Sequence, residues 1–500
     1  MKILLIMPKI FPKEEIDYNY TFPLGICYIS AVIKKAGYNV KCLNLNHYEG
    51  IEKTLREELK NNYDIVATGS IWMGFIVIKA IVAITRMYSP KSKIIIGGTL
   101  ISSKPELVMY ELKPDFGVIG EGEETIIELI RCIEKKENVE GVKGICFIND
   151  NTLFITETRE GVKDIDSLSY PDLDGFEFEK YLDEMYTNQM YQNNILDYPR
   201  TYSILTARGC TFHCTFCYHQ ESSCRERSIN VVIKELKWAK EKYKINIVNI
   251  LDDTFGMKEE RIMEFCNKIK PLNLNWTCQM IVSSIDNELL LLKMKECGCY
   301  LISYGFESYS KDILKSMKKS ITPEQIDYAI RTTMKVGIGI QGNFIFGDIK
   351  ETKETAQITL DYWKRKCKGQ VKLGFIQPYA GSNIYGWSIA KGVIKDEVRY
   401  MSKEIWNENF FNITESMTNQ EINELMTEII TLRNSGYFAN VFPTQIYKLP
   451  KEDRYKVEVK CPYCNSDNSY DNYYFKMDTW YKDYMMCREC GMRYNICKPI

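Results

Sequence analysis

Short apolar segments alternate with amphipathic helical patterns along most of this chain, and this alternation limits its fold more than any other feature. In the first block, the expected strands are KILLIM, NVKCLNL, DIVATG, KIIIGG and FGVIG. Between the first two, Leu24, Cys27 and Tyr28 fall on one face of a helical pattern. Five such units predict an α/β fold with a Rossmann-like, doubly wound parallel sheet over residues 1–145.

A second block of alternation begins at Tyr202. Its expected strands are YSILTA, INIVNIL, NWTCQM, YLISYGF, GIQGNFIF and KLGFIQPY, each followed by a helical pattern. Six βα units predict a partial TIM-type (β/α)6 barrel over residues 198–395. The remaining boundaries that we expect are a hairpin and linker at 146–197, a helical region at 396–456 and a four-cysteine ribbon at 457–500.

Composition and charge exclude several classes of protein. A chain of 500 residues with 45% hydrophobic content can bury two or three cores. A net charge of -1 provides no basic field for nucleic acid. The apolar runs are too short to span a membrane, and the start of the chain turns polar too soon for a signal peptide. We therefore expect a cytoplasmic protein whose 18 cysteines are buried thiols and metal ligands.

Three cysteines follow the first strand of the second block in the stretch RGCTFHCTFCYH. They are Cys210, Cys214 and Cys217, at the strand end where barrel enzymes carry their active sites. Three thiolates can hold three irons of a four-iron cluster and leave the fourth iron open to another ligand. Zinc is the alternative for the triplet alone, because zinc sites also use short cysteine spacings.

The C-x-x-x-C-x-x-C pattern, with Phe216 before its last cysteine, resembles that of the radical S-adenosylmethionine (SAM) superfamily. This resemblance implies that the open iron binds SAM and that an electron from the cluster cleaves it to methionine and a 5′-deoxyadenosyl radical. The later strand ends NILDDTF, YGFES, GNFIFGDIKET and QPYAGSNIY match that family in order and spacing, although GDIKET departs from its usual GxPGET.

The same resemblance assigns roles to residues at these strand ends. Asp252 or Asp253 lies where the family recognises the amino group of SAM, and Glu307 lies where it contacts the ribose. Asn343 and Gln377 are further candidates for SAM binding. Each carboxylate could instead cap the helix that follows it.

The first block resembles the cobalamin-binding domain that precedes the barrel in one radical SAM subclass. FPLGICYISAVIKKAGYNV, IIIGGTLISSKPE and FGVIGEGEETIIEL carry this resemblance. The D-x-H-x-x-G motif is missing, so the resemblance is to cobalamin domains without a histidine ligand, and His47 is interpreted as a loop residue. Glycines in these loops could admit a large ligand or serve tight turns, and Trp72 could cover the cobalt or belong to the core. The cofactor-binding candidates here are Gly69, Ser70, Trp72, Gly97, Gly98, Thr99, Gly120, Glu121, Gly122 and Glu123.

The combination implies a cobalamin-dependent radical SAM methyltransferase. In such an enzyme, the deoxyadenosyl radical takes hydrogen from an unactivated carbon of a small molecule or peptide, and that carbon then receives a methyl group from methylcobalamin; phosphorus is the second choice of acceptor. The alternatives are a cobalamin-dependent cyclase or rearrangement enzyme, an RNA-modifying methylthiotransferase, and a non-catalytic binding scaffold. The expected partner is a reductant, a flavodoxin- or ferredoxin-like electron donor.

Two further C-x-x-C pairs, CPYC and CREC, lie near the end of the sequence. They comprise Cys461, Cys464, Cys487 and Cys490, and Gly491 could form the turn after the second pair. Four thiolates at this spacing predict a closed, tetrahedral structural zinc site. A second iron–sulfur cluster is the alternative.

Overall fold

The computed structural model describes residues 1–188, 195–218, 223–285, 287–404, 411–434, 439–451, 453–475 and 484–498. The chain forms two compact units, each built from separate stretches of sequence. The first unit comprises Met1–Tyr181, Phe216–Arg225 and Gln377–Asn409, and the second comprises Leu182–Thr215, Glu226–Ile376 and Phe410–Ile500.

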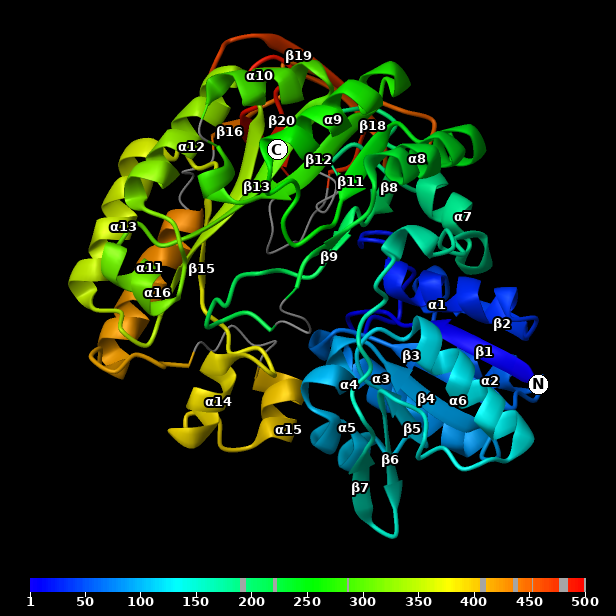
Figure 1. Ribbon diagram of the computed structural model, residues 1–500. Coiled ribbons are helices and arrows are strands. Elements are labelled where there is room, and N and C mark those ends of the chain that lie inside the picture. Colours follow the sequence, from blue (N-terminus) through cyan, green and yellow to red (C-terminus); the bar gives the residue numbers. More distant parts are fainter. Residues whose placement is uncertain are drawn as a thin grey trace. The chain divides into compact units, whose positions relative to one another are not determined.

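The first unit is built on a seven-stranded sheet with the order β2-β1-β3-β4-β5-β6-β7. The first five of these strands in the chain are parallel, and their order 2-1-3-4-5 is a doubly wound order, as expected. The β6–β7 hairpin continues the sheet, because β6 pairs antiparallel with β5 (Figure 1). The strands are β1 (Lys2–Met7), β2 (Asn39–Asn44), β3 (Ile65–Gly69), β4 (Lys93–Gly97), β5 (Phe116–Val118), β6 (Ile145–Asn149) and β7 (Thr152–Ile155).

The helices of this unit form two groups, in which α1 contacts α6, and α3 contacts both α2 and α5. The expected apolar face of α1 is confirmed, since Leu24, Cys27 and Tyr28 are buried. The segments of this unit outside the sheet are α1 (Leu24–Lys35), η1 (Leu45–His47), α2 (Ile51–Leu59), η2 (Trp72–Gly74), α3 (Phe75–Tyr88), α4 (Thr99–Ser103), α5 (Pro105–Leu112), α6 (Glu123–Lys135), η3 (Ile165–Ser167), η4 (Asp174–Phe176), α14 (Asn383–Ala390), α15 (Glu397–Arg399) and the π-helix η7 (Tyr400–Glu404).

The second unit contains an open six-stranded sheet, and its strands occur in the order of the sequence, β15-β14-β13-β12-β11-β8. All neighbouring strands are parallel, which confirms the expected partial barrel. The strands are β8 (Thr201–Ile204), β11 (Ile247–Ile250), β12 (Asn275–Met280), β13 (Cys299–Glu307), β14 (Gly339–Phe346) and β15 (Lys372–Phe375).

Helices connect these strands, and polar side chains define where several of them begin. Ser228 caps α8, and Thr322 forms a capping box at the start of α12. The connecting helices are α8 (Ile229–Tyr243), α9 (Glu259–Ile269), α10 (Glu288–Glu296), α11 (Lys311–Ser316), α12 (Pro323–Val336) and α13 (Lys353–Lys366). The shorter elements of this unit are β9 (Ala207–Arg208), η5 (Lys270–Leu272) and η6 (Val282–Ser284), and two further short elements, α7 (Phe178–Asp183) and β10 (Arg225–Glu226), contain residues of both units.

The last part of the second unit contains one helix and two small sheets, with orders β16-β21-β20 and β17-β18-β19. Helix α16 buries Ile422, Leu425 and Ile429. The small sheets share a core that includes Val457 and Tyr470. These elements are α16 (Asn419–Asn434), β16 (Asn440–Val441), β17 (Gln445–Lys448), β18 (Tyr455–Lys460), β19 (Asp467–Tyr473), β20 (Tyr484–Met486) and β21 (Arg493–Ile496).

Within the described ranges, the chain has no helix of the length and apolar character needed to cross a membrane.

Candidate active site

Asp252, directly after β11, anchors the start of the three-cysteine loop. Its carboxylate accepts hydrogen bonds from the backbone N–H groups of Thr206 at 2.6 Å and Ala207 at 3.0 Å, and from the Thr206 hydroxyl. Burial raises the pKa of Asp252 to about 6, and these hydrogen bonds act against the rise. Asp253 is exposed, so it is the better candidate of the two aspartates for contacting a ligand.

The cysteine loop lies beyond β9 and is held by the backbone. Gly209, with φ of +87°, makes the turn into the loop, and the Thr215 N–H donates to the Met317 carbonyl at 3.2 Å. Cys210 and Cys214 are buried, and Cys217 is half-buried. Burial raises the pKa of the Cys210 thiol. Iron binding displaces such a proton, and three thiols on one loop fit the cluster that the sequence predicts.

Glu307 ends β13 in a backbone conformation that non-glycine residues rarely adopt. Its φ is +60°, and the strand register shifts between Gly305 and Glu307. A bulge of this kind re-aims a side chain, and such strain is common at functional sites. The carboxylate is largely buried, so its pKa is raised, and an ion pair with Lys319 Nζ at 3.3 Å opposes that rise.

One face of the six-stranded sheet is polar, although parallel sheets usually bury both faces in apolar contacts. Strand pairing aligns these polar side chains in rows. One row joins Ser203, Asn249 and Thr277, the next joins Gln279, Ser303 and Gln341, and the third joins Asn343 and Lys372.

The side chains at the carboxyl ends of this face are accessible. Gln279 and Asn343 are exposed, whereas Trp276, Cys278 and Met280, which alternate with these polar residues along β12, are buried. Sequence reasoning identified Asn343 but missed the other residues in these rows. The available signal was the alternation of polar and apolar residues in NWTCQM and GIQGNFIF.

Glycines at the carboxyl ends of β3 and β4 let two segments of the first unit approach each other. A Cβ atom on Gly69 would lie 2.9 Å from the Gly97 carbonyl oxygen, and one on Gly98 would lie 2.7 Å from the Ser70 carbonyl oxygen. These glycines therefore serve the turns. A Cβ atom on Gly97 would meet no atom within 4 Å, so this position has open space for a ligand to approach the backbone. The adjacent candidate, Thr99, begins α4.

The GEGE stretch after β5 is held by polar contacts. Gly120, with φ of +88°, donates its N–H to Ser102 Oγ at 3.1 Å. The Glu121 carboxylate accepts from the Val162 N–H at 2.7 Å and from both terminal nitrogens of Arg225, at 2.7 and 3.1 Å. Glu121 thus joins three segments of the first unit. Gly122 precedes α6, and Glu123 is buried in the first turn of that helix.

Two other residues that the sequence singled out have aromatic or polar partners. The Trp72 ring packs against the Tyr379 ring in a tilted arrangement, with 4.6 Å between ring centroids and 33° between the ring planes. His47 is buried; its Nδ1 lies 3.2 Å from Glu177 Oε2, and its Nε2 lies 3.2 Å from the Tyr20 hydroxyl. Both nitrogens of His47 therefore have protein partners, and His47 is the last residue of the 3-10 helix η1 rather than a loop residue. Gln377 is half-buried and follows β15.

The four tail cysteines come together. Their sulfur atoms all lie within 4.8 Å of one another, with 3.8 Å between Cys461 and Cys490 and 3.7 Å between Cys464 and Cys487. They form no disulfide. The Tyr463 N–H donates to Cys461 Sγ, as backbone groups do around metal-bound thiolates. Part of the aromatic insert between the two pairs, residues 476–483, lies outside the described residues.

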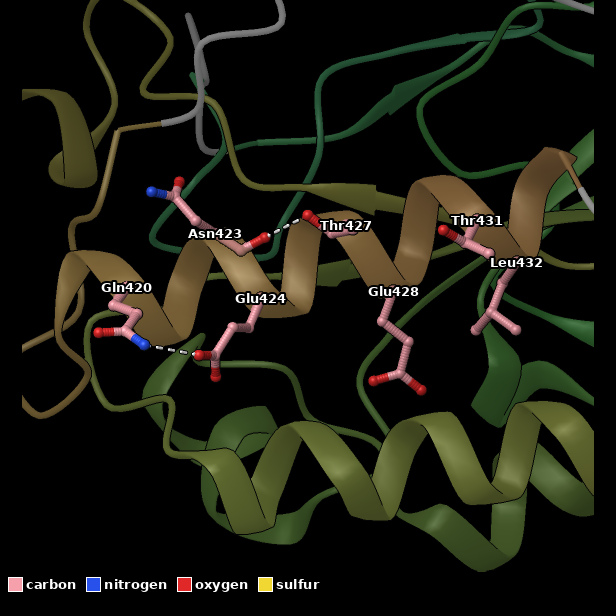
Figure 2. A pocket seen from close by; sticks show the side chains of 7 residues that line it. All are labelled: Gln420, Asn423, Glu424, Thr427, Glu428, Thr431 and Leu432. Carbon is pink, nitrogen blue, oxygen red and sulfur yellow. Dashed lines mark hydrogen bonds between the residues drawn. The ribbon is translucent and has the colours of Figure 1, made fainter.

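A second feature is an open hollow of about 750 Å³ along α16 (Figure 2). Its lining includes Gln420, Glu424, Thr427 and Glu428, and none of the residues around it belongs to the candidate sites above. In Figure 2 the Gln420 side chain donates to Glu424 at 3.0 Å.

Comparison with known proteins matches a known domain family to part of each unit of the chain. Residues 204–362 match the radical SAM superfamily, and residues 17–130 match the B12 binding domain. The chain is a B12-binding radical SAM enzyme. The three-cysteine loop and the first-unit loops of this enzyme fall inside the matched ranges.

Relatives of this B12-binding radical SAM enzyme span most of its length. An uncharacterized methyltransferase of Pyrococcus horikoshii is 28% identical over 410 residues, which cover 79% of this chain and 84% of the relative. Cytidylyl-2-hydroxyethylphosphonate methyltransferase of Streptomyces wedmorensis is 24% identical over 85% of this chain and 88% of its own. Magnesium-protoporphyrin IX monomethyl ester cyclases and a protein named as a methylthiotransferase are also similar.

A solved structure shares the fold. The radical SAM methyltransferase TsrM of Kitasatospora setae, determined with bound cobalamin and a [4Fe-4S] cluster, superposes with a TM-score of 0.63 at 16% identity over 79% of this chain and 75% of its own. This likeness concerns the fold alone.

Proposed function

We propose that this enzyme is a cobalamin-dependent radical SAM methyltransferase that acts on an unactivated carbon, or secondarily on phosphorus, of a small molecule or peptide. One observation carries the proposal: a B12 binding domain and a radical SAM domain occur on one chain, and relatives named as methyltransferases span more than three quarters of it. A cytoplasmic location and a flavodoxin- or ferredoxin-like electron donor are parts of the same proposal.

The residues of the chain would share the binding of three groups. When bound, the cluster and SAM supply radical chemistry, and cobalamin carries a methyl group. Cys210, Cys214 and Cys217 would hold the cluster. Asp253 and Glu307 would bind polar groups of SAM, and Asp252 would keep the cysteine loop in position through Thr206 and Ala207.

The polar sheet face would complete the SAM and substrate site. Gln279 and Asn343 are exposed there at strand carboxyl ends. Neutral amides donate and accept hydrogen bonds, so they suit a ligand with hydroxyl, amine and carboxylate groups. In the first unit, the backbone beside Gly97 would accept the face of a large cofactor.

The tail cysteines would hold one structural zinc ion. Zinc is tetrahedral and prefers thiolates in closed sites, and the four sulfurs already lie within 4.8 Å of one another. The boundaries 198–395 for the barrel, 396–456 for the helical region and 457–500 for the ribbon remain part of the proposal.

The test uses full-length protein reconstituted anaerobically with iron, sulfide and cobalamin. With SAM labelled in its methyl group and a chemical reductant, we expect 5′-deoxyadenosine to form and the label to transfer to cobalamin. The Cys217→Ala variant should lose cleavage of SAM, whereas Cys224→Ala, seven residues further on and outside the motif, should retain it. Absence of SAM cleavage in the wild-type protein would refute the proposal and favour a binding scaffold.

A cyclase or rearrangement enzyme is the second candidate, supported by the similarity to cyclases. It predicts SAM cleavage without transfer of the labelled methyl group. The same assay therefore separates the two functions before the substrate is known.

A further inference from the structure

We infer that the four-cysteine module is a metal-dependent plug that closes the amino-terminal end of the six-stranded sheet. This inference rests on the proposed zinc site and concerns what that site does for the rest of the second unit. The module is formed by β16 to β21, which make two small sheets.

The two cysteine pairs have the same backbone geometry. The Cys461 N–H donates to the Ser466 carbonyl and the Cys487 N–H to the Met492 carbonyl, both at 2.9 Å. One residue after each pair, Asn465 and Gly491 have φ of 62° and 70°. The N–H groups of these two residues donate back to the carbonyls of Cys461 and Cys487, both at 3.0 Å. Two equal turns that each present two sulfurs are suited to one tetrahedral ion.

The second turn packs directly on the loop that leads into β14. A Cβ atom on Gly337 would lie 3.3 Å from the Glu489 carbonyl oxygen, and a Cβ atom on Gly491 would lie 2.6 Å from the Gly337 carbonyl oxygen. A Cβ atom on Gly339, the first residue of β14, would lie 3.1 Å from the Gly491 carbonyl oxygen. Backbone thus meets backbone, and glycine is required at this contact.

A buried polar contact fastens the module to the start of β15. Gln370, two residues before that strand, accepts from the Arg493 N–H at 2.8 Å and donates to the Arg493 carbonyl at 3.0 Å. The Arg493 side chain also donates to the Gln370 carbonyl, and both residues are at most 2% exposed. In addition, the Tyr463 hydroxyl donates to the Lys368 carbonyl at 3.2 Å.

Apolar contacts complete the plug. Met486, next to Cys487, is buried with Ile247, Tyr300 and Leu301. Ile247 is the first residue of β11, and Tyr300 and Leu301 lie at the start of β13. All these contacts are at the amino ends of the strands.

The position of the plug decides between a structural and a chemical role for its metal. Glu307 ends β13, whose nine residues span roughly 26 Å at the usual rise per residue. The metal site therefore lies at the far end of the sheet from the strand ends that carry barrel active sites. This placement favours structural zinc over a second iron–sulfur cluster that contacts substrate.

The test compares three full-length variants by metal analysis and hydrogen–deuterium exchange. Cys490→Ser removes a ligand in the docked turn. Gln370→Ala keeps all four thiolates and breaks the contact with Arg493. Cys497→Ser changes a cysteine of the same module outside the four-sulfur group and is the control.

We expect Cys490→Ser to lose its zinc, and both Cys490→Ser and Gln370→Ala to exchange at least about tenfold faster at residues 299–303 and 337–341. Gln370→Ala should keep its zinc. Exchange in β1 to β5 and the absorbance of the radical SAM cluster should match those of Cys497→Ser.

The possible results test the plug and the zinc assignment separately. Zinc loss in Cys490→Ser with unchanged exchange at the strand starts would overturn the plug while leaving the zinc assignment intact. Iron in place of zinc in the wild-type module would refute the zinc assignment. If Cys490→Ser does not fold, unchanged exchange in Gln370→Ala alone overturns the plug.

Discussion

Replacing Asp252 by asparagine tests whether this buried carboxylate positions the cysteine loop or binds a ligand. Asp252 is 3% exposed and accepts three hydrogen bonds from Thr206 and Ala207. An asparagine of the same shape keeps an acceptor for the two backbone N–H groups. The Thr206 hydroxyl can turn to accept from the new amide, so Asp252→Asn should retain the loop.

The raised pKa of Asp252 determines how much Asp252→Asn should change the stability of the protein. A rise from 3.8 to about 6 means that the ionised carboxylate costs roughly 3 kcal/mol of stability at neutral pH. Because the folded-state pKa is raised, this cost is absent below pH 3.8, where the carboxyl group is protonated in both states, and it develops as the pH rises through about 6. Asp252→Asn should therefore be more stable than the wild type at pH 7.5, by up to about 3 kcal/mol, and the advantage should shrink at pH 5.

Alanine at the same position should have the opposite effect. It leaves two buried N–H groups without their acceptor, at a cost of roughly 2–6 kcal/mol. The assay is urea unfolding at pH 5 and 7.5 followed by circular dichroism, with SAM cleavage measured in parallel. Asp252→Asn should cleave SAM, whereas Asp253→Asn should be impaired. Equal destabilisation by asparagine and alanine at pH 7.5, or loss of cleavage in Asp252→Asn alone, would refute the reasoning.

Three further predictions concern other parts of the sites. Glu307→Gln should raise the KM for SAM at least about tenfold without loss of cluster absorbance, because it removes the charged acceptor that would bind polar groups of SAM; an unchanged KM would exclude Glu307 from SAM binding. Glu121→Gln should speed proteolysis next to Arg225, within residues 223–225, because it weakens the contact between Glu121 and Arg225, and equal cleavage rates would contradict that role. Gly97→Val should weaken cobalamin binding at least about tenfold with unchanged thermal stability, since its side chain would enter open space; cobalamin titration measures this, and unaltered affinity would place the cofactor elsewhere.

The chemistry and the order of the elements were readable from the sequence. Residues close together in the chain define both cysteine motifs, so spacing alone predicted Cys210, Cys214 and Cys217 as cluster ligands and predicted the four-sulfur group that the structure assembles. The two sheets were also predictable, because alternation of apolar strands with helices leaves few ways to bury both. Scattered cysteines such as Cys146 and Cys367 are buried in the core, as expected.

Tertiary structure decided which of several similar residues faces which neighbour. Asp252 and Asp253 are equivalent in a sequence, and only the position of Thr206 and Ala207 on the adjacent strand end separates the buried carboxylate from the exposed one. Strand alternation likewise defines two faces of β12 without saying which one the helices cover. The contact between Gly337 and Gly491 joins residues far apart in the chain, and such contacts depend on how whole elements pack rather than on any local pattern.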